Sequence, residues 1–198
     1  MFSRKFFRSA VRILSFDSTK IDVSFWKERL FNAYQLRKSL NLIREDNDSF
    51  RLIHGEGDCL PGLIVDIYGD TAVVQAHSVG MHTIRMEIAN AIIDVFQGKI
   101  KNVFYKSEST LPYKANIQVE DGYLIGECND DCIAKENGLL FHVDWLKGQK
   151  TGFFIDQREN RSLLEKYSKE RKILNMFCYT GGFSFYAMRG GALQVDSV

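Results

Sequence analysis

The 198-residue sequence lacks any apolar run long enough to cross a bilayer, so we expect no membrane-spanning role. It also lacks the paired cysteine spacings of a disulfide framework or a metal site. Its four cysteines, which fit free thiols in a reducing, cytoplasmic compartment, are Cys59, Cys128, Cys132 and Cys178. Cys128 and Cys132 could supply half a metal site at most, so we expect no bound metal. The sequence has no internal repeat and no low-complexity tract.

A strong excess of positive charge is also missing, since the formal net charge is only +1. Residues 1–50 carry ten Lys or Arg against six acids, residues 51–150 carry nine against fourteen, and residues 151–198 carry seven against five. The net acidic middle region offers no general electrostatic footprint for a polyanion. Only the basic start and the stretch with Arg158 and Arg161 have the charge expected of a nucleic-acid contact.

Two phosphate-binding signatures are absent as well: a Walker loop with its Lys-Ser/Thr pair, and the G-x-G-x-x-G turn. The sequence has instead the run L-N-M-F-C-Y-T-G-G-F at residues 174–183. The apolar stretch Ile173 to Phe177 is typical of a buried parallel strand, and residues 180–182 interrupt it. Apolar residues at helical spacing follow, and Gly190-Gly191 ends the predicted helix.

A second predicted strand follows with Ala192, Leu193 and Val195. The whole run therefore predicts the opening strand–helix–strand unit of a doubly wound sheet, whose ligands bind where the first strand meets its helix. Gly181 and Gly182 permit close backbone approach to a ligand but make little of the amide nest that phosphates need. The pattern favours a nucleoside ligand without phosphates.

A second motif, G-Q-K-T-G-F-F-I-D-Q-R-E-N-R, occupies residues 148–161. Asp156 with Glu159 three residues later predicts a capping box at the start of a helix. The amides at such a helix start, with the Gln157 and Arg158 side chains, suit a carboxylate group. Taken alone, the same residues also fit an ordinary capped helix with a solvated arginine face.

Together the two motifs strongly resemble the S-adenosylmethionine-dependent ribosomal RNA methyltransferases built from a PUA domain, a central domain and a Rossmann-like catalytic domain. The run L-P-G-L-I-V-D at residues 60–66 resembles a signature of the family's central domain. The resemblance covers nearly the whole chain. Members resembling it methylate cytosine C5 in large-subunit ribosomal RNA, which implies an S-adenosylmethionine cofactor and a ribosomal RNA partner.

The resemblance also implies which residues hold the cofactor. Aligned with the L-D-x-G-x-G-T-G run of class I methyltransferases, Asn175 takes the acid's place, Phe177 and Tyr179 the first two glycines, and Gly181 the last. We expect Gly181 either at a positive φ or against the cofactor. The implied cofactor-lining residues are Phe177, Tyr179, Thr180, Gly181 and Gly182 with Asn175 beneath them, and Phe153, Asp156, Gln157 and Arg158 at the amino-acid end. No catalytic residue is implied within this chain.

The implied fold class is an α+β central domain followed by the opening strand–helix–strand of an α/β Rossmann-like class I methyltransferase domain. The expected divisions are residues 1–20 as the remnant of an N-terminal PUA-like domain, residues 21–148 as the central domain and residues 149–198 as the truncated start of the Rossmann-like domain. Ala10 to Phe16 then forms the last PUA strand. The acid-free, arginine-bearing start also fits an organelle transit peptide.

In the family, the acid that holds the cofactor ribose, a D-P-P-like motif and the cysteine that attacks the pyrimidine follow at positions beyond Val198. Cys178 stands in the cofactor loop, on the wrong element for that nucleophile. We therefore expect the chain alone to be inactive, and residues 157–198 to be mobile, protease-labile or paired in a homodimer. Two rivals are a non-catalytic RNA- or ribosome-binding fragment and an NAD or nucleotide enzyme, and the missing G-x-G-x-x-G disfavours the latter.

Between residues 21 and 148 the pattern is mixed, which predicts an α+β fold. Expected helices run from Asp22 or Ser24 to about Leu42 and from Ile84 to Val95. Expected strands cover residues 63–68, 72–77, 101–106, 123–127, 131–135 and 139–144. Gly69-Asp70 and Asn137-Gly138 are typical of hairpin turns. The four histidines share no spacing, so we expect structural roles for them.

Overall fold

The computed structural model describes residues 12–112, 117–127 and 132–198. A five-stranded mixed sheet occupies its centre, with the strands in the order in which they follow along the chain. The strands are β1 (Ser49–His54), β2 (Leu63–Tyr68), β3 (Thr71–Ala76), β4 (Asn102–Tyr105) and β5 (Gly122–Ile125). β3 and β4 are parallel, whereas the other neighbours are antiparallel.

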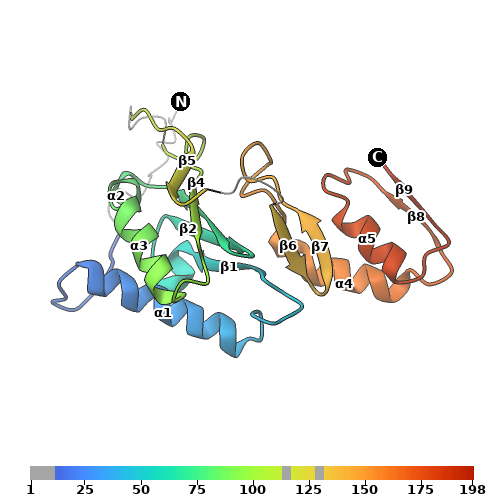
Figure 1. The fold of residues 1–198 in the computed structure, drawn as a ribbon, viewed down its shortest axis with the longest axis horizontal. Helices are drawn as coiled ribbons and strands as arrows, with labels where there is room; N and C mark the ends of the chain where they lie inside the picture. The colour runs from blue at the N-terminus through green and yellow to red at the C-terminus, as the bar shows by residue number, and fades with distance from the viewer. Residues whose placement is uncertain (1–11, 113–116, 128–131) are drawn as a thin grey trace, which may run out of the picture.

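Three helices cover one face of this sheet: α1 (Val23–Ser39), α2 (Val79–Thr83) and α3 (Arg85–Val95) (Figure 1). Asp22 caps α1 by accepting a hydrogen bond from the Ser24 N–H at 3.0 Å. Alternate strand residues point toward the helices, so Val65 and Val74 are fully buried against Leu30 of α1. These contacts make the larger of two hydrophobic cores.

The opposite face of the sheet packs against a hairpin, β6 (Ile133–Glu136) and β7 (Leu139–His142), and against the segment that follows it. The hairpin turns at Asn137-Gly138, where φ is 48° and 82°, as a tight two-residue turn requires. The second core joins the sheet to residues far along the chain. Its buried members are Tyr68, Val73, Phe104, Ala134, Phe141, Val143, Trp145, Phe153 and Tyr186.

The last part of the chain contains a short 3₁₀ turn, η3 (Ile155–Gln157), and then α4 (Arg158–Tyr167), β8 (Lys172–Asn175), α5 (Gly182–Arg189) and β9 (Gln194–Ser197). β8 and β9 are parallel and are joined through α5, as the sequence predicts. Figure 1 shows this unit at one end of the molecule, with α4 lying beside the β6–β7 hairpin. Gly190 ends α5 and Gly191 has a φ of 83°.

The Gly69-Asp70 and Asn137-Gly138 hairpins are confirmed, and the expected strands lie within two residues of the observed ones. Strand β1 was not predicted. The strand predicted for Ala10 to Phe16 is wrong over its described part, because residues 12–16 join no sheet and Ser15 instead bonds locally with Asp17 and Thr19. Residues 10 and 11 lie outside the described residues.

One predicted helix differs in extent. It ends at Ser39 rather than near Leu42, because Asn41 adopts a φ of 54°, which a helix cannot continue through. The helix expected from Ile84 to Val95 is confirmed as α3, and the short helix α2 precedes it. The predicted division at residue 149 stays a prediction, since Trp145 and Phe153 lie on either side of it in one core.

Within the described residues, every helix is too short or too polar to cross a membrane. The same residues contain no cluster of three or more His, Cys, Asp or Glu side chains placed to hold a metal ion. Cys59 and Cys178 are free thiols, and Cys128 lies outside the described residues.

Candidate functional site

The loop between β8 and α5 has an unusual backbone. Phe177, Tyr179 and Gly181 all adopt positive φ values, of 60°, 47° and 72°. Such values are uncommon outside glycine and cost free energy at aromatic residues, so the surrounding structure must hold the loop in place. The expectation of a positive φ at Gly181 is confirmed. Phe177 and Tyr179, which stand at glycine positions of the methyltransferase pattern, adopt the backbone that glycine would favour.

Tyr179 is the residue that holds this loop. Its hydroxyl accepts a hydrogen bond from the Gln149 N–H at 2.9 Å and donates one to the Gly152 carbonyl at 3.3 Å. Glycine is required at position 148, because a Cβ there would lie 2.6 Å from the Tyr179 hydroxyl and would also clash with the Asp144 carbonyl. The two motifs recognised in the sequence are therefore in direct contact.

The segment carrying Gln149 is in turn attached to the central sheet. Thr151 is fully buried, donates a hydrogen bond to the Asp66 carboxylate at 2.6 Å and lies 2.9 Å from the Tyr68 hydroxyl. The Lys106 ammonium group donates to the carbonyls of Trp145 and Gly148 at 2.7 and 2.6 Å. Burial lowers the pKa of Lys106. The loop next to β8 is thus positioned by groups on β2 and by Lys106, which directly follows β4.

A pocket of about 330 Å³ lies between the two motifs. Seven of the ten residues predicted to hold the cofactor line it: Phe153, Asp156, Gln157, Phe177, Tyr179, Thr180 and Gly182. Five further lining residues were missed: Lys150, Phe154, Arg161, Cys178 and Phe183. All five belong to the same two sequence motifs, so their position in those motifs was the signal that could have identified them.

Three predicted residues lie outside the pocket lining. Gly181 is in the loop itself, where an added Cβ would lie 3.3 Å from the Phe185 ring. Asn175 is 9% exposed and donates a hydrogen bond to the Ser184 hydroxyl at 2.8 Å, which ties β8 to α5. Arg158 is buried at the start of α4, where it donates to the Glu136 carboxylate and to the Ser49 carbonyl.

The capping box predicted at Asp156 is wrong. Helix α4 begins at Arg158 without a side-chain cap, and Asp156 lies in the preceding 3₁₀ turn, η3. Because the chain is already helical there, Asp156 cannot take the extended conformation of an N-cap residue. Its carboxylate instead accepts a hydrogen bond from the Gln157 amide at 3.2 Å and lies 4.0 Å from the Lys150 ammonium.

Arg161 forms the base of the pocket. Its guanidinium donates two hydrogen bonds, both at 2.7 Å, to the fully buried Glu136 carboxylate, and a third to the Phe154 carbonyl at 3.0 Å. The guanidinium carbon lies 4.6 Å from the centre of the Phe153 ring. Glu136 also accepts a hydrogen bond from Tyr186 at 3.0 Å. Burial and the Glu136 charge raise the pKa of Tyr186 to about 12, so this hydroxyl stays protonated.

The rim of the pocket carries separated charges beside aromatic rings. The Lys150 ammonium lies 4.4 Å from the centre of the Phe154 ring, and the Phe154 ring meets Tyr179 edge-on. Phe177 is 92% exposed. A small site with a carboxylate, an ammonium group and aromatic surfaces is suited to a zwitterionic ligand that also carries an aromatic ring.

A comparison with known protein families gives a match to the part of the chain that contains this pocket. The profile of a family described as S-adenosylmethionine-dependent methyltransferase matches residues 109–198, which include every residue of the pocket. Over these residues the chain is similar to that family. The family match thus includes both motifs on which the resemblance was based.

Relatives extend the similarity to nearly the whole chain. A "Ribosomal RNA large subunit methyltransferase I" from Vibrio vulnificus is 37% identical over 185 residues, which is 93% of this chain and 46% of the relative. A solved structure of a proposed SAM-dependent methyltransferase from Streptococcus mutans is 26% identical, with a TM-score of 0.78 over 93% of this chain and 47% of that one.

A further solved methyltransferase-like structure, described as complexed with SAH, has a TM-score of 0.77 and 26% identity over 91% of this chain and 45% of that one. The fold is therefore that of Rossmann-like SAM methyltransferases with a mixed sheet. The chain spans about half the length of these relatives.

Proposed function

We propose that this chain carries the cofactor site of an S-adenosylmethionine-dependent methyltransferase that modifies cytosine C5 in large-subunit ribosomal RNA. The observation that carries the proposal is the pocket between the two motifs, at the loop that connects β8 to α5. Ligands of doubly wound folds bind at this place. The family match and the names of the relatives support the methyltransferase activity and the ribosomal RNA substrate.

The residues present fit this cofactor. Its ammonium group is matched by the Asp156 carboxylate, which is 58% exposed, and its carboxylate is matched by the Lys150 ammonium. The missing side chains of Gly181 and Gly182 leave the start of α5 open to close approach. A volume of about 330 Å³ is within the range of small-molecule sites. When bound, S-adenosylmethionine supplies an activated methyl group.

In this proposal, the remaining predicted residues form or support the walls of the pocket. Phe177, Tyr179 and Thr180 form one wall, Phe153 and Gln157 form the other, and Asn175 fixes the strand beneath by its bond to Ser184. Arg158 shares the Glu136 carboxylate with Arg161 and so keeps the base of the pocket in place. We assign no catalytic residue within the described part of the chain.

We further propose that the protein acts in the cytoplasm and forms a homodimer. The support for a dimer is the apolar surface on the last unit, where Leu174, Met188 and Leu193 are 61%, 59% and 70% exposed. Light scattering coupled to gel filtration measures this directly. A monomeric mass at every protein concentration would contradict the dimer.

The cofactor assignment is tested by calorimetric titration of the 198-residue chain with S-adenosylhomocysteine. We expect saturable binding that is lost when Asp156 and Lys150 are both replaced by Ala. Substituting exposed Lys169 and Asp196, which lie outside the pocket lining, provides the matched control. RNA binding without any cofactor binding would instead favour the non-catalytic RNA-binding alternative.

The substrate assignment is tested with labelled S-adenosylmethionine and large-subunit ribosomal RNA from cells that lack the gene. The assay uses the complete product of the gene that encodes this chain. We expect 5-methylcytidine among the digested nucleosides after incubation with that product. Label on a ribose, a purine or only on protein would contradict the proposed reaction.

A further inference from the structure

A second cavity, of about 590 Å³, adjoins the candidate cofactor pocket. Lys150 and Asp156 line both cavities, so the two share a wall. The floor of the second cavity is the face of the central sheet opposite α1 and α3, at the place where the second core does not cover it. We call this cavity the sheet cleft. Its other lining residues are Arg12, Arg51, His54, Gly55, Glu56, Gly62, Leu63, Ile64, Gln75 and His77.

Gln75 on β3 is the notable group in the floor of the sheet cleft. It pairs in register with Ile64 of β2, and it is only 8% exposed. Within the described part of the chain, its side-chain amide makes no hydrogen bond. The one buried side-chain polar atom without a partner among the described residues is Asn47 Oδ1, so the Gln75 amide reaches the solvent of the cleft. The amide offers one acceptor and two donors. The cleft therefore contains an amide without a hydrogen-bond partner, next to the apolar side chain of Ile64.

Three cationic side chains line the same cleft as this amide. Arg12 pairs with Glu56 at 3.3 Å, with its side chain 41% exposed, and Arg51 pairs with the buried Asp66 at 2.8 Å. Lys150 is 53% exposed on the wall shared with the cofactor pocket. These side chains come from three distant parts of the chain. The fold thus brings three cations to one cleft, each within 4.0 Å of a carboxylate.

The His77 imidazole adds a neutral polar group at the end of the cleft. Partial burial, and then the charges of Arg12 and Arg51, lower the pKa of His77, while Glu56 opposes them. At neutral pH the ring therefore offers one donor and one acceptor. An apolar floor, an amide edge and neighbouring arginines together suit a planar base attached to a phosphate.

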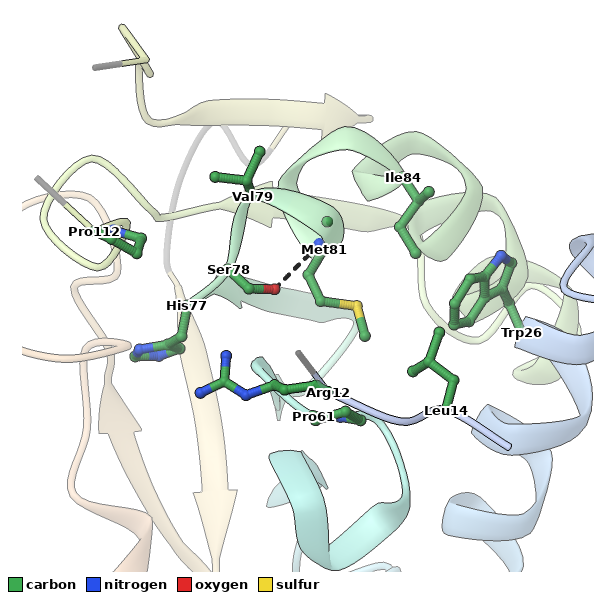
Figure 2. Close-up of a pocket in the computed structure, with 11 residues that line it drawn as sticks. Arg12, Leu14, Trp26, Pro61, His77, Ser78, Val79, Met81, Ile84 and Pro112 are labelled. Atoms are coloured by element: carbon green, nitrogen blue, oxygen red, sulfur yellow. Dashed lines mark hydrogen bonds between the residues drawn. The ribbon is translucent and has the colours of Figure 1, made fainter. Parts of the chain in front are cut away.

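The sheet cleft continues into a third cavity of about 600 Å³, shown in Figure 2. Arg12 and His77 line both cavities, and Figure 2 shows the Arg12 side chain reaching toward His77. Beyond them the lining is mostly apolar, with Trp26 and Met81 among its residues. Two joined cavities suit successive nucleotides of a single strand better than one small molecule.

We propose that the sheet cleft holds an unpaired nucleotide of the RNA substrate, with the Gln75 amide hydrogen-bonded to the base edge and Arg12 facing the phosphate. This inference rests on the proposed function and names the part of the chain that reads the RNA next to the cofactor. Contacts to base edges determine sequence specificity, whereas contacts to phosphates only position the RNA. Gln75 is therefore expected to discriminate between bases, and Arg12 to contribute affinity without discrimination.

The test measures binding of short fluorescein-labelled oligocytidylate, and of the same RNA with abasic positions, by fluorescence anisotropy. Gln75→Met is expected to weaken binding of the intact RNA roughly tenfold and to leave the abasic RNA unchanged. Arg12→Gln is expected to weaken the binding of both RNAs equally. It should also reduce the slope of log affinity against log salt concentration by about 1.

Matched substitutions control for surface effects. Gln35→Met on the exposed side of α1 and Arg171→Gln after α4 make the same chemical changes away from every cavity described above, and should leave both RNAs bound as in the wild type. Equal binding of intact RNA by Gln75→Met and wild type would overturn the inference. So would an equal loss on intact and abasic RNA.

Two further measurements separate this inference from the proposed function and from misfolding. Thiouridine-containing RNA photocrosslinked to the unmodified protein should label peptides from β2 or β3, and labelling confined to other elements would overturn the cleft. Calorimetry with S-adenosylhomocysteine is run on the same preparations. Cofactor binding without an effect at Gln75 refutes only the cleft, whereas absent cofactor binding refutes the proposed function.

Discussion

The guanidinium of Arg161 donates two hydrogen bonds to the carboxylate of Glu136, and neither group reaches solvent to more than 2%. The pair joins the candidate cofactor pocket, where Arg161 is the base, to the hairpin that packs on the central sheet. A buried ion pair does not by itself imply high stability, because both charges lose their hydration. Removing one partner, however, leaves the other charge buried without compensation.

Glu136→Gln should therefore destabilise the protein by about 3–5 kcal/mol, since it leaves Arg161 and Arg158 without their shared carboxylate. Urea unfolding followed by circular dichroism measures the change. Glu165→Gln is the matched control: Glu165 pairs with Arg189 at a partly exposed site and should cost about 1 kcal/mol or less. Equal losses in the two variants would contradict the structural role given to Glu136.

Gly181→Val should lose cofactor affinity as well as stability. Its φ of 72° disfavours a β-branched residue by about 1–2 kcal/mol, and the new side chain would press on the Phe185 ring. Gly98→Val provides the control, because Gly98 has a φ of 78° in open space far from the pocket. Both variants should unfold earlier in urea, but only Gly181→Val should fail to bind S-adenosylhomocysteine in calorimetry. Unchanged affinity there would remove the loop from the cofactor site.

Tyr179→Phe removes the hydroxyl that bonds to Gln149 and Gly152. Two hydrogen bonds of this kind contribute about 1–3 kcal/mol together, and the loop would lose the contact that holds its positive-φ backbone. We expect a lower urea midpoint and weaker S-adenosylhomocysteine binding. Tyr167→Phe, at a side chain that is 69% exposed, should change neither. A wild-type affinity in Tyr179→Phe would show that the loop keeps its shape without this bond.

Stability should fall with pH below about 6.5, partly because of His77. Its pKa in the folded protein lies below the ordinary 6.5, so the unfolded chain binds a proton more readily in the interval between the two values. The folded state is then favoured above pH 6.5 and progressively loses that advantage as pH falls toward the lowered pKa. His77→Gln should flatten this part of the curve of unfolding free energy against pH.

The remaining slope in that interval includes His82, whose pKa burial and Arg85 also lower. The double variant with His82→Gln should be flatter still. If the single and double variants kept the wild-type slope between pH 6.5 and the acid limit of folding, these imidazoles would not be the groups responsible.

Much of the secondary structure followed from local sequence signals. Asn137, Gly138 and Gly69 specify their turns because few other residues tolerate the positive φ values there, and Gly191 has a positive φ directly after α5. The β8–α5–β9 unit was predicted from apolar spacing and paired glycines. In the same way, the two motifs identified most of the residues that line the candidate cofactor pocket.

Other features depended on contacts between segments distant in the sequence, which no local pattern records. The sequence by itself determined that Arg158 and Arg161 would follow the second motif, but only the tertiary structure decided that both turn toward Glu136, more than twenty residues earlier. Asp156 lost its predicted cap because the chain enters a 3₁₀ turn before α4. Gln75 reads as an ordinary strand residue until the fold places its unpaired amide at the cleft that Arg12 and Lys150 also line, because exposure and electrostatic neighbours are properties of packing rather than of sequence order.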